Sequence, residues 1–238
     1  CHLLRAQLEV LGFIITRDGI KPNPDKVQAL RDLPDRLENQ KAVYRFLGMI
    51  NFNRRFIYKI GDTAAPLHAL LKKDLVGQPW PWTDTCQRAY DALRASLTAD
   101  CMQSHPDLTD PFAEYVLMTD ASDVAAGAVL MQWQKAMPYD NEGYVEPDIE
   151  YSASDSFLQV HAKRIAAGYT LKTLGYYSKV FADAQKNWAI FDKEAASILL
   201  SMEHWHRLVA GRPITVYTDN TVAASILSNR HYPRPPRL

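Results

Sequence analysis

Two short apolar segments of the chain each run into a Thr-Asp pair, and their acids are candidate metal ligands. Residues 115–119 lead into Asp120, and residues 214–218 lead into Asp219. Short apolar runs that end in a small polar turn predict strands. If these strands are parallel neighbours, the two acids lie about 5 Å apart in backbone terms. Two carboxylates at that distance repel each other unless a divalent cation lies between them.

A third acid lies between these segments, on a predicted long helix at about residues 189–209. Its apolar stripe consists of Ala195, Ile198, Leu199, Met202, Trp205, His206 and Val209. Glu194 falls near the rim of that stripe, about 80° from its centre at 100° per residue, so it can reach a site beside the sheet. Three acids at one sheet edge predict Mg²⁺-dependent phosphodiester chemistry. A single Asp after a strand, by contrast, usually serves as a turn or cap residue.

The composition narrows the classes of protein. The chain has 238 residues, with 27 Lys and Arg against 27 Asp and Glu, so any contact with nucleic acid must use local basic patches. Its three cysteines have no disulfide or zinc spacing and fit a reducing compartment. There is no signal peptide and no long apolar span. The first residue is not Met and the last seven are Pro-rich, so we expect a fragment of a longer polypeptide or an unusual tail.

The first hundred residues predict a mainly helical region. Residues 8–16 predict a strand, and residues 17–19 predict a turn. Asn23 and Pro24 predict a helix start, a second helix is expected over about 40–59, and Pro66 is expected to begin a short third one. The second helix carries basic residues beside its apolar stripe: Arg45, Arg54, Arg55 and Lys59. They form either a solvated face or a surface that contacts backbone phosphates.

From Trp80 onward, the sequence predicts the end of the helical region and the start of a second domain. Trp80 and Trp82 either stack bases or plug a small helical core, and a helix is expected over about 83–97. The Pro-bounded stretch at 105–111 predicts a domain boundary, after which strands dominate. Residues 137–156 predict a long loop, which is either functional or an insertion. Residues 161–171 predict a short helix, and residues 173–180 predict a strand. A last helix is expected over 220–229.

These motifs together resemble the reverse transcriptase–RNase H region of gypsy-type long-terminal-repeat retrotransposon polyproteins. The matching segments, in order, are 10–20 (VLGFIITRDGI), 24–30 (PDKVQAL), 46–57 (FLGMINFNRRFI), 64–67 (AAPL), 70–73 (LLKK), 82–84 (WTD), 119–122 (TDAS), 127–132 (GAVLMQ), 192–195 (DKEA) and 217–219 (YTD). The resemblance covers nearly the whole chain outside residues 134–170. It implies an α/β (α+β overall) fold, in which a small helical thumb-like domain precedes an RNase H-like mixed β-sheet flanked by helices.

The resemblance also implies domains and roles. Residues 1–20 end the polymerase palm, 21–104 form the thumb and connection, and 105–238 form an RNase H-like domain with an insertion at about 134–170. The implied site residues are primer-grip-like Leu11, Gly12 and Phe13; catalytic, metal-binding Asp120, Glu194 and Asp219; and nucleic-acid-binding Arg54, Arg55, Lys59, Ser122 and Asn220. Two Mg²⁺ ions, replaceable by Mn²⁺, would support in-line attack of water on the RNA strand.

The implied partners are an RNA–DNA hybrid, a template–primer duplex and the remainder of the Pol polyprotein. The implied location is the cytoplasmic virus-like particle of a retroelement, with the nucleus as the other compartment. The polymerase Asp-Asp motif would lie upstream of residue 1, and the fourth RNase H carboxylate would lie beyond residue 238. Two hypotheses stay open: an enzyme fragment, or a catalytically inactive nucleic-acid-binding or structural module from a decayed retroelement. An unrelated Mg²⁺ phosphohydrolase would explain the acids but not residues 10–83.

Overall fold

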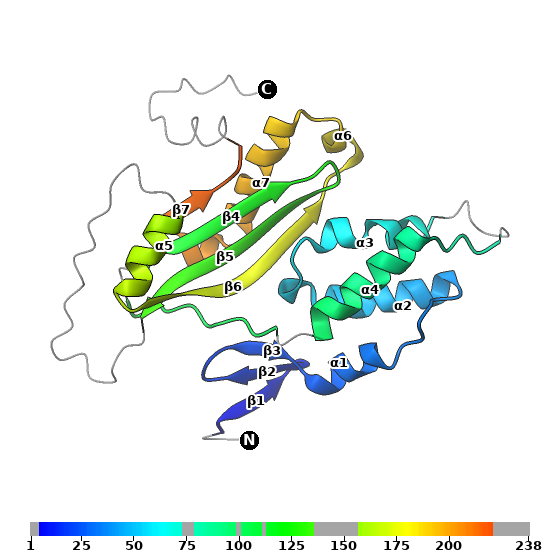
Figure 1. The fold of residues 1–238 in the computed structure, drawn as a ribbon, viewed down its shortest axis with the longest axis horizontal. Coiled ribbons are helices and arrows are strands. Elements are labelled where there is room, and N and C mark those ends of the chain that lie inside the picture. Colours follow the sequence, from blue (N-terminus) through cyan, green and yellow to red (C-terminus); the bar gives the residue numbers. More distant parts are fainter. Residues whose placement is uncertain (1–4, 73–78, 99–100, 111–112, 136–156, 221–238) are drawn as a thin grey trace.

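The computed structural model describes residues 5–72, 79–98, 101–110, 113–135 and 157–220, and it confirms a mixed α/β fold (Figure 1). The first elements are β1 Gln7–Val10, β2 Phe13–Thr16, β3 Ile20–Pro22, α1 Pro24–Arg31, α2 Gln40–Phe52, the 3-10 helix η1 Arg54–Phe56, α3 Ile60–Ala69 and α4 Asp84–Thr98. The later elements are β4 Tyr115–Ala121, β5 Ala125–Lys135, α5 Phe157–Ala166, β6 Tyr169–Val180, α6 Asp183–Lys186, α7 Ile190–His204, α8 His206–Val209 and β7 Ile214–Tyr217. Within the described ranges, every helix is too short or too polar to cross a membrane.

The N-terminal segment is a three-stranded antiparallel sheet, so the single strand expected over residues 8–16 is wrong. β1 pairs with β2 and β2 with β3. Leu11 and Gly12 form the two-residue turn between β1 and β2, both with positive φ (51° and 81°). This is the geometry of tight hairpin turns, in which Gly adopts positive φ without a steric penalty. Gly12 inside the apolar run was the available sequence signal.

The helical part, residues 24–98, contains α1 to α4 and has its own core. Asn23 caps α1 by accepting from the amide of Asp25 at 2.9 Å, and Asn39 caps α2 by accepting from Ala42 at 2.9 Å. The buried core residues are Leu30, Leu37, Val43, Phe46, Leu47, Ile50, Phe56, Ile57, Ile60, Ala64, Leu67, Leu70, Cys86, Ala89, Tyr90, Leu93 and Leu97. Trp80 and Trp82 pack against this core, which favours their structural interpretation.

Two helix predictions in this part need correction. The helix expected over 40–59 ends at Phe52, where Asn53 caps it and the chain turns through η1. The helix expected to begin at Pro66 begins at Ile60, and Pro66 lies inside it. Lys59 marks the break between these helices, because its backbone is left-handed with φ 49°. Local spacing alone did not show this turn, since apolar residues continue at helical intervals on both sides.

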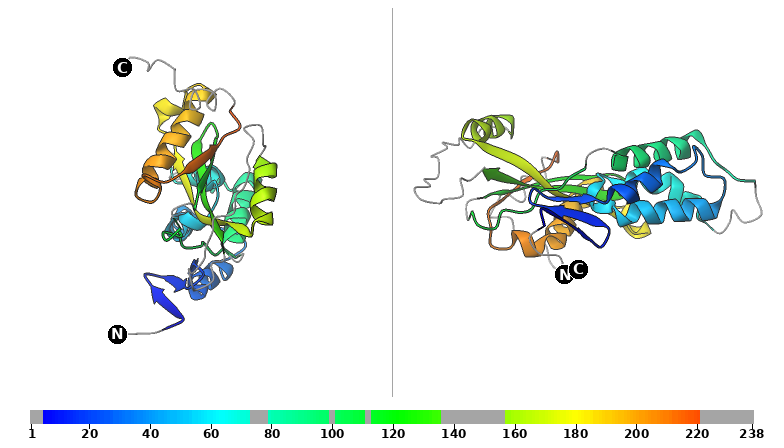
Figure 2. Two further views of the ribbon diagram at one scale, coloured as in Figure 1. Left: turned by 90° about the vertical axis from the view of Figure 1, so that its left-hand side faces the viewer. Right: turned by 90° about the horizontal axis from the view of Figure 1, so that it is seen from below.

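The sheet part, residues 113–220, is a four-stranded mixed sheet with strand order β6-β5-β4-β7. β4 is antiparallel to β5 and parallel to β7, and β5 is antiparallel to β6. α5 and α7 cover opposite faces of this sheet (Figure 2). Along β4, Tyr115 and Leu117 share a cluster with Trp205, whereas Val116 lies on the other face with Trp133. This alternation is the expected two-residue period of a strand.

The other predictions for this part differ from the structure in their bounds or lie outside the described residues. β6 begins at Tyr169, so the helix expected over 161–171 is α5 at 157–166. The loop expected at 137–156 and the helix expected after Asn220 lie outside the described residues. The long helix expected to end at Val209 breaks at Trp205 into α7 and α8. The domain boundaries at residues 20 and 104 stay predictions.

Candidate functional site

Parallel pairing of β4 and β7 sets the positions of Asp120 and Asp219. Asp120 lies within β4, opposite Gly127 of β5, rather than just after the strand as expected. The last pair of the parallel ladder is Met118 with Tyr217. Continuing that register by two residues sets Asp120 beside Asp219, which is exposed just past the end of β7. The register therefore directs both acids to the same end of the sheet.

Glu194 reaches the same end from α7. Its Oε1 atom accepts a hydrogen bond from the backbone amide of Ala121 at 3.1 Å. Ser197, one turn later, donates to the carbonyl oxygens of Asp120 at 3.3 Å and Gly127 at 3.2 Å. These bonds fasten α7 to the backbone of β4 and β5, and they place the Glu194 carboxylate one residue along from Asp120.

The surroundings of Glu194 disfavour its charged form. The side chain is buried, with 3% of the residue exposed, and its Oε2 atom has no hydrogen-bond partner among the described residues. Burial raises the pKa of Glu194, and the negative charge of Asp219 raises it further; the Ala121 amide and the charge of Lys59 act in the opposite direction.

Lys59 comes from the turn before α3 and forms an ion pair with Asp120. The side chains of both partners keep about a third of their surface exposed, 35% and 34%. Lys59 was predicted to contact nucleic acid, yet here it lies against the candidate catalytic acid.

The two predicted substrate contacts are also placed near this end. The hydroxyl of Ser122 donates to the carboxylate of Asp62 from α3, and it accepts from the amides of Val124 and Ala125, both at 3.0 Å. Asn220 is half-buried, and its backbone amide donates to the Thr218 hydroxyl at 3.2 Å. Sequence analysis missed Asp62, because it lies in a helix of the other part of the chain.

The oxygen donors fit a hard divalent cation in chemistry. Carboxylates are the preferred protein ligands of Mg²⁺, and the unpartnered, buried Glu194 Oε2 is an orphaned polar atom that a cation would satisfy. Within the described ranges, however, no three acids, histidines or cysteines converge tightly enough to form a ready-made metal cluster. Asp120 faces Lys59 instead.

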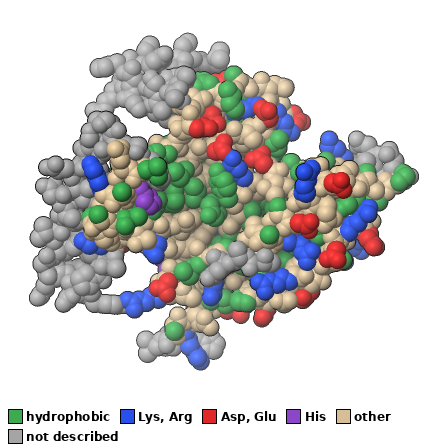
Figure 3. Space-filling view, viewed as in Figure 1, with side chains coloured by type: hydrophobic (Ala, Val, Ile, Leu, Met, Phe, Trp, Pro, Cys, Tyr) green, Lys and Arg blue, Asp and Glu red, His purple; other side chains and the backbone are tan. Residues whose placement is uncertain are grey.

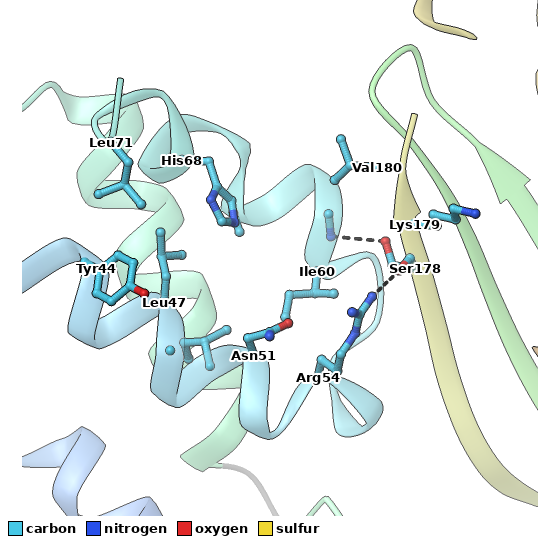
Figure 4. Close-up of a pocket in the computed structure, with 14 residues that line it drawn as sticks. Tyr44, Leu47, Asn51, Arg54, Ile60, His68, Leu71, Ser178, Lys179 and Val180 are labelled. Carbon is cyan, nitrogen blue, oxygen red and sulfur yellow. Dashed lines mark hydrogen bonds between the residues drawn. The ribbon is translucent and has the colours of Figure 1, made fainter. Parts of the chain in front are cut away.

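Arg54 and Arg55 join the helical part to the sheet part. Arg54 donates to the Ser178 carbonyl on β6, and the Ser178 hydroxyl accepts from the Gly61 amide at 3.1 Å (Figure 4). Arg55 donates to Gln103 Oε1 at 2.9 Å, and burial lowers the pKa of its guanidinium. A cavity of about 510 Å³ lies beside this joint; Figure 4 shows its lining by Tyr44, Asn51, His68 and Lys179, among others. The expected choice between a solvated and a phosphate-binding face therefore omitted a third role, as bridges between the two parts.

The primer-grip-like residues lie beside the C-terminal end of α2 and η1. Leu11 is 85% exposed at the hairpin turn, and the Phe13 ring stacks on Phe52 with centroids 5.0 Å apart. A groove of about 730 Å³ lies here, lined by Leu11, Gly12, Lys26, Ala29, Leu30, Arg45, Gly48, Met49, Phe52 and Asn53. The lining of this groove thus combines two cationic side chains, Lys26 and Arg45, with mainly apolar residues.

Charge on the visible surface is mixed rather than segregated. On the face in Figure 3, Lys and Arg alternate with Asp and Glu over the helical part, and apolar side chains gather over the sheet. This agrees with the balanced composition.

Comparisons with known proteins agree with this fold. Residues 110–238 match the family described as the RNase H-like domain found in reverse transcriptase. This chain is 29% identical to the transposon Tf2-3 and Tf2-4 polyproteins of Schizosaccharomyces pombe (strain 972 / ATCC 24843), over 243 aligned residues that cover the whole chain. The chain spans 15% of the length of each polyprotein.

Solved structures are similar in fold. The foamy viral protease–reverse transcriptase in complex with double-stranded DNA matches with TM-score 0.63 at 19% identity, covering 99% of this chain and 40% of that one. The same viral protein in complex with an RNA/DNA hybrid matches with TM-score 0.61 at 19% identity, covering 90% and 24%. The expected resemblance to a retrotransposon polyprotein is confirmed, and the chain belongs to the family of RNase H-like domains found in reverse transcriptase.

Proposed function

We propose that this chain is the thumb and RNase H section of a retrotransposon reverse transcriptase, and that it hydrolyses the RNA strand of RNA–DNA hybrids with divalent metal ions. The observation that carries the proposal is the parallel β4–β7 register, which directs Asp120 and Asp219 to one end of the sheet beside Glu194. Three acids from two strands and a helix supply the oxygen ligands that this hydrolysis needs.

In this proposal the chain's residues hold and orient the reactants. Asp120, Glu194 and Asp219 would hold two Mg²⁺ ions. When bound, these ions would lower the pKa of the attacking water and stabilise the leaving 3′ oxygen. Ser122 and Asn220, on the loops after β4 and β7, would contact the substrate backbone. Selectivity for RNA would come from contacts to 2′-hydroxyl groups across the wide minor groove.

The groove beside the hairpin supports a duplex-binding role for the helical part. Its exposed cations, Lys26 and Arg45, would contact backbone phosphates, while Leu11 and Phe52 would pack against sugars. The solved foamy viral relatives were captured with double-stranded DNA and with an RNA/DNA hybrid, which makes both duplexes reasonable ligands to test here.

A second candidate function is a nucleic-acid-binding module without catalysis. The observation that favours it is the ion pair that places Lys59, rather than open space for a cation, against Asp120. Such a module would bind duplexes through the groove and stay inert in the presence of metal.

The test is cleavage of a labelled RNA–DNA hybrid with Mg²⁺ or Mn²⁺. It compares this chain, a chain extended beyond residue 238, and Asp120→Asn in both. Asp192→Asn, an exposed acid of the same helix as Glu194, is the matched control. Cleavage that is lost in Asp120→Asn and kept in Asp192→Asn supports the enzyme. Absence of cleavage from folded chains of both lengths, with duplex binding retained, supports the binding module.

A further inference from the structure

The start of α3 lies along a row of three residues that crosses the sheet. Asp120 on β4 is directly opposite Gly127 on β5, and Gly127 is directly opposite Ser178 on β6. Cross-strand partners present their side chains on the same face of a sheet. The row therefore forms one continuous strip, and the candidate acid is at one end of it.

Each residue of the strip meets a residue from the turn before α3 or from its first turn. At β6, the Ser178 hydroxyl accepts from the Gly61 amide at 3.1 Å. At β5, the absence of a side chain on Gly127 leaves room for Lys59, whose Cγ atom would lie 3.3 Å from an added Cβ. At β4, the Lys59 ammonium pairs with Asp120.

Glycine at position 61 permits this close approach. A Cβ atom there would lie 2.8 Å from Ser178 Oγ and 2.9 Å from Ala125 Cβ, closer than real Cβ atoms come to their neighbours. Ser122 adds a further bond by donating to Asp62. The first turn of α3 is thus held against the sheet by the contacts of Gly61 and Asp62.

The backbone of Lys59 also adopts an uncommon conformation. Its φ of 49° is in the left-handed region, which non-glycine residues seldom occupy. The contacts of Gly61 and Asp62 offset that cost, so the lysine position depends on docking of α3 against the sheet.

We propose that Lys59 is an intramolecular competitor for the cation site at Asp120, so that docking of α3 and binding of a divalent metal oppose each other. The inference rests on the proposed function, because it requires Asp120 to be a metal ligand. The Lys59 ammonium and a divalent cation both pair with the carboxylate of Asp120. A metal ion can bind there only when the ammonium withdraws. By linkage, a metal that binds Asp120 weakens the docking of α3 by the same factor.

The first measurement is Mn²⁺ binding to the whole chain by calorimetry, without substrate. Lys59→Met keeps the length of the side chain and removes its charge. We expect Mn²⁺ affinity to rise about two- to fivefold, as for removal of an ion pair whose partners are about one third exposed. Lys179→Met, which removes an exposed charge from β6 beside Ser178, is the control for a general change in charge. It should leave Mn²⁺ affinity within experimental error.

A second variant separates docking from charge. Gly61→Val keeps Lys59 but prevents close approach of α3, so it should raise Mn²⁺ affinity as Lys59→Met does. The double variant should show no further rise, because both changes remove the same competition. Circular dichroism verifies that each variant is folded. Hydrogen exchange at the Gly61 amide, which is bonded to Ser178, should quicken when Mg²⁺ is added to the unmodified chain.

The outcomes distinguish failure of this inference from failure of the proposed function. One outcome is that Mn²⁺ binds the unmodified chain and that this binding is lost in Asp120→Asn. If both Lys59→Met and Gly61→Val then leave the Mn²⁺ affinity unchanged, the competition is refuted while the metal site stands. If neither the unmodified chain nor either variant binds Mn²⁺ through Asp120, both ideas fall. Equal gains in Lys59→Met and Lys179→Met would also overturn the competition.

Discussion

Glu194 is joined to the strand that carries Asp120 by one hydrogen bond, from the Ala121 amide to Glu194 Oε1 at 3.1 Å. The other carboxylate oxygen is buried and unpartnered within the described part of the chain. Burial and the nearby charge of Asp219 raise the pKa of this acid. The site therefore holds a carboxylate at a cost in stability, as functional sites often do.

Replacing this acid separates stability from metal binding. In Glu194→Gln the amide oxygen still accepts from Ala121, and the disfavoured charge is gone. We expect the free energy of unfolding without divalent metal to stay equal or to rise by up to about 1 kcal/mol. We also expect Mg²⁺ to lose its stabilising effect. Urea unfolding with and without Mg²⁺ measures both, with Asp192→Asn as the control. A large loss of stability without metal would contradict this account.

Duplex binding should depend on the groove beside the hairpin more than on the joint between the two parts. Lys26→Ala plus Arg45→Ala removes two exposed cations, and the slope of log affinity against log salt should flatten by about 0.9 for each lost phosphate contact. Fluorescence anisotropy of a labelled duplex at several salt concentrations measures this slope. The comparison variant is Arg54→Ala plus Arg55→Ala, whose guanidinium groups already donate to Ser178 and Gln103. Flattening only in that variant would move the phosphate contacts to the joint.

Local patterns predicted the strand before Asp120 and the helix that carries Glu194, and both are present as β4 and α7. The predicted apolar stripe of the helix is only partly its buried face, because Leu199 is 69% exposed whereas Glu194 and Ser197 are buried. Parallel pairing of the two Thr-Asp segments was the condition on which the predicted metal site depended. The pairing of β4 with β7 meets that condition.

Contacts between distant parts could not be predicted in this way. Asp62 and Ser122 are 60 residues apart, and nothing in their local sequence indicates that they meet. The same holds for Lys59, which was interpreted as part of a continuous helix. Its left-handed turn is stabilised by docking against the sheet rather than by local propensity. Patterns of hydrophobicity report burial within an element, but they do not identify the partner across an interface.

The imidazole of His204 should make the free energy of unfolding depend on pH. Its ring stacks on Tyr177 with centroids 4.5 Å apart. Desolvation of the ring lowers the pKa of His204, and the charges of Arg54 and Arg55 lower it further. A folded pKa below the unfolded value means that the unfolded chain binds more protons in the window between them. Stability from this group is therefore complete above about pH 6.5 and is lost as the pH falls through the lowered folded value.

Two measurements check this pH dependence. An NMR titration should give His204 a pKa below the ordinary value of about 6.5, and Arg54→Ala should move it upward. Urea unfolding at successive pH values should show a smaller decline toward acid in His204→Gln than in the unmodified chain. His206→Gln, two residues later on an equally exposed residue, is the control and should leave the decline unchanged. A His204 pKa unmoved by Arg54→Ala would refute the contribution of the arginine.

The side chain of Gln132 should be essential for the stability of the sheet part. It is fully buried on β5, at 0% exposure. Its Oε1 atom accepts from the Asp107 amide at 2.7 Å and from Gln134 at 2.9 Å, and its Nε2 atom donates to the Asp107 carbonyl at 2.9 Å. Gln132→Leu fills a similar volume but leaves both backbone groups of Asp107 unpaired. We expect it to lower the free energy of unfolding by about 2–3 kcal/mol.

Urea unfolding followed by tryptophan fluorescence measures this loss, because Trp133 is next to the substituted residue. Gln28→Leu is the matched control: its side chain donates to Asp32 on the exposed surface of α1, where water replaces the lost bond. We expect that control to change stability by less than about 0.5 kcal/mol. A loss in Gln132→Leu no larger than in Gln28→Leu would mean that the segment before β4 is held by its other contacts, such as the bond from Gln134 to the His105 carbonyl at 2.7 Å.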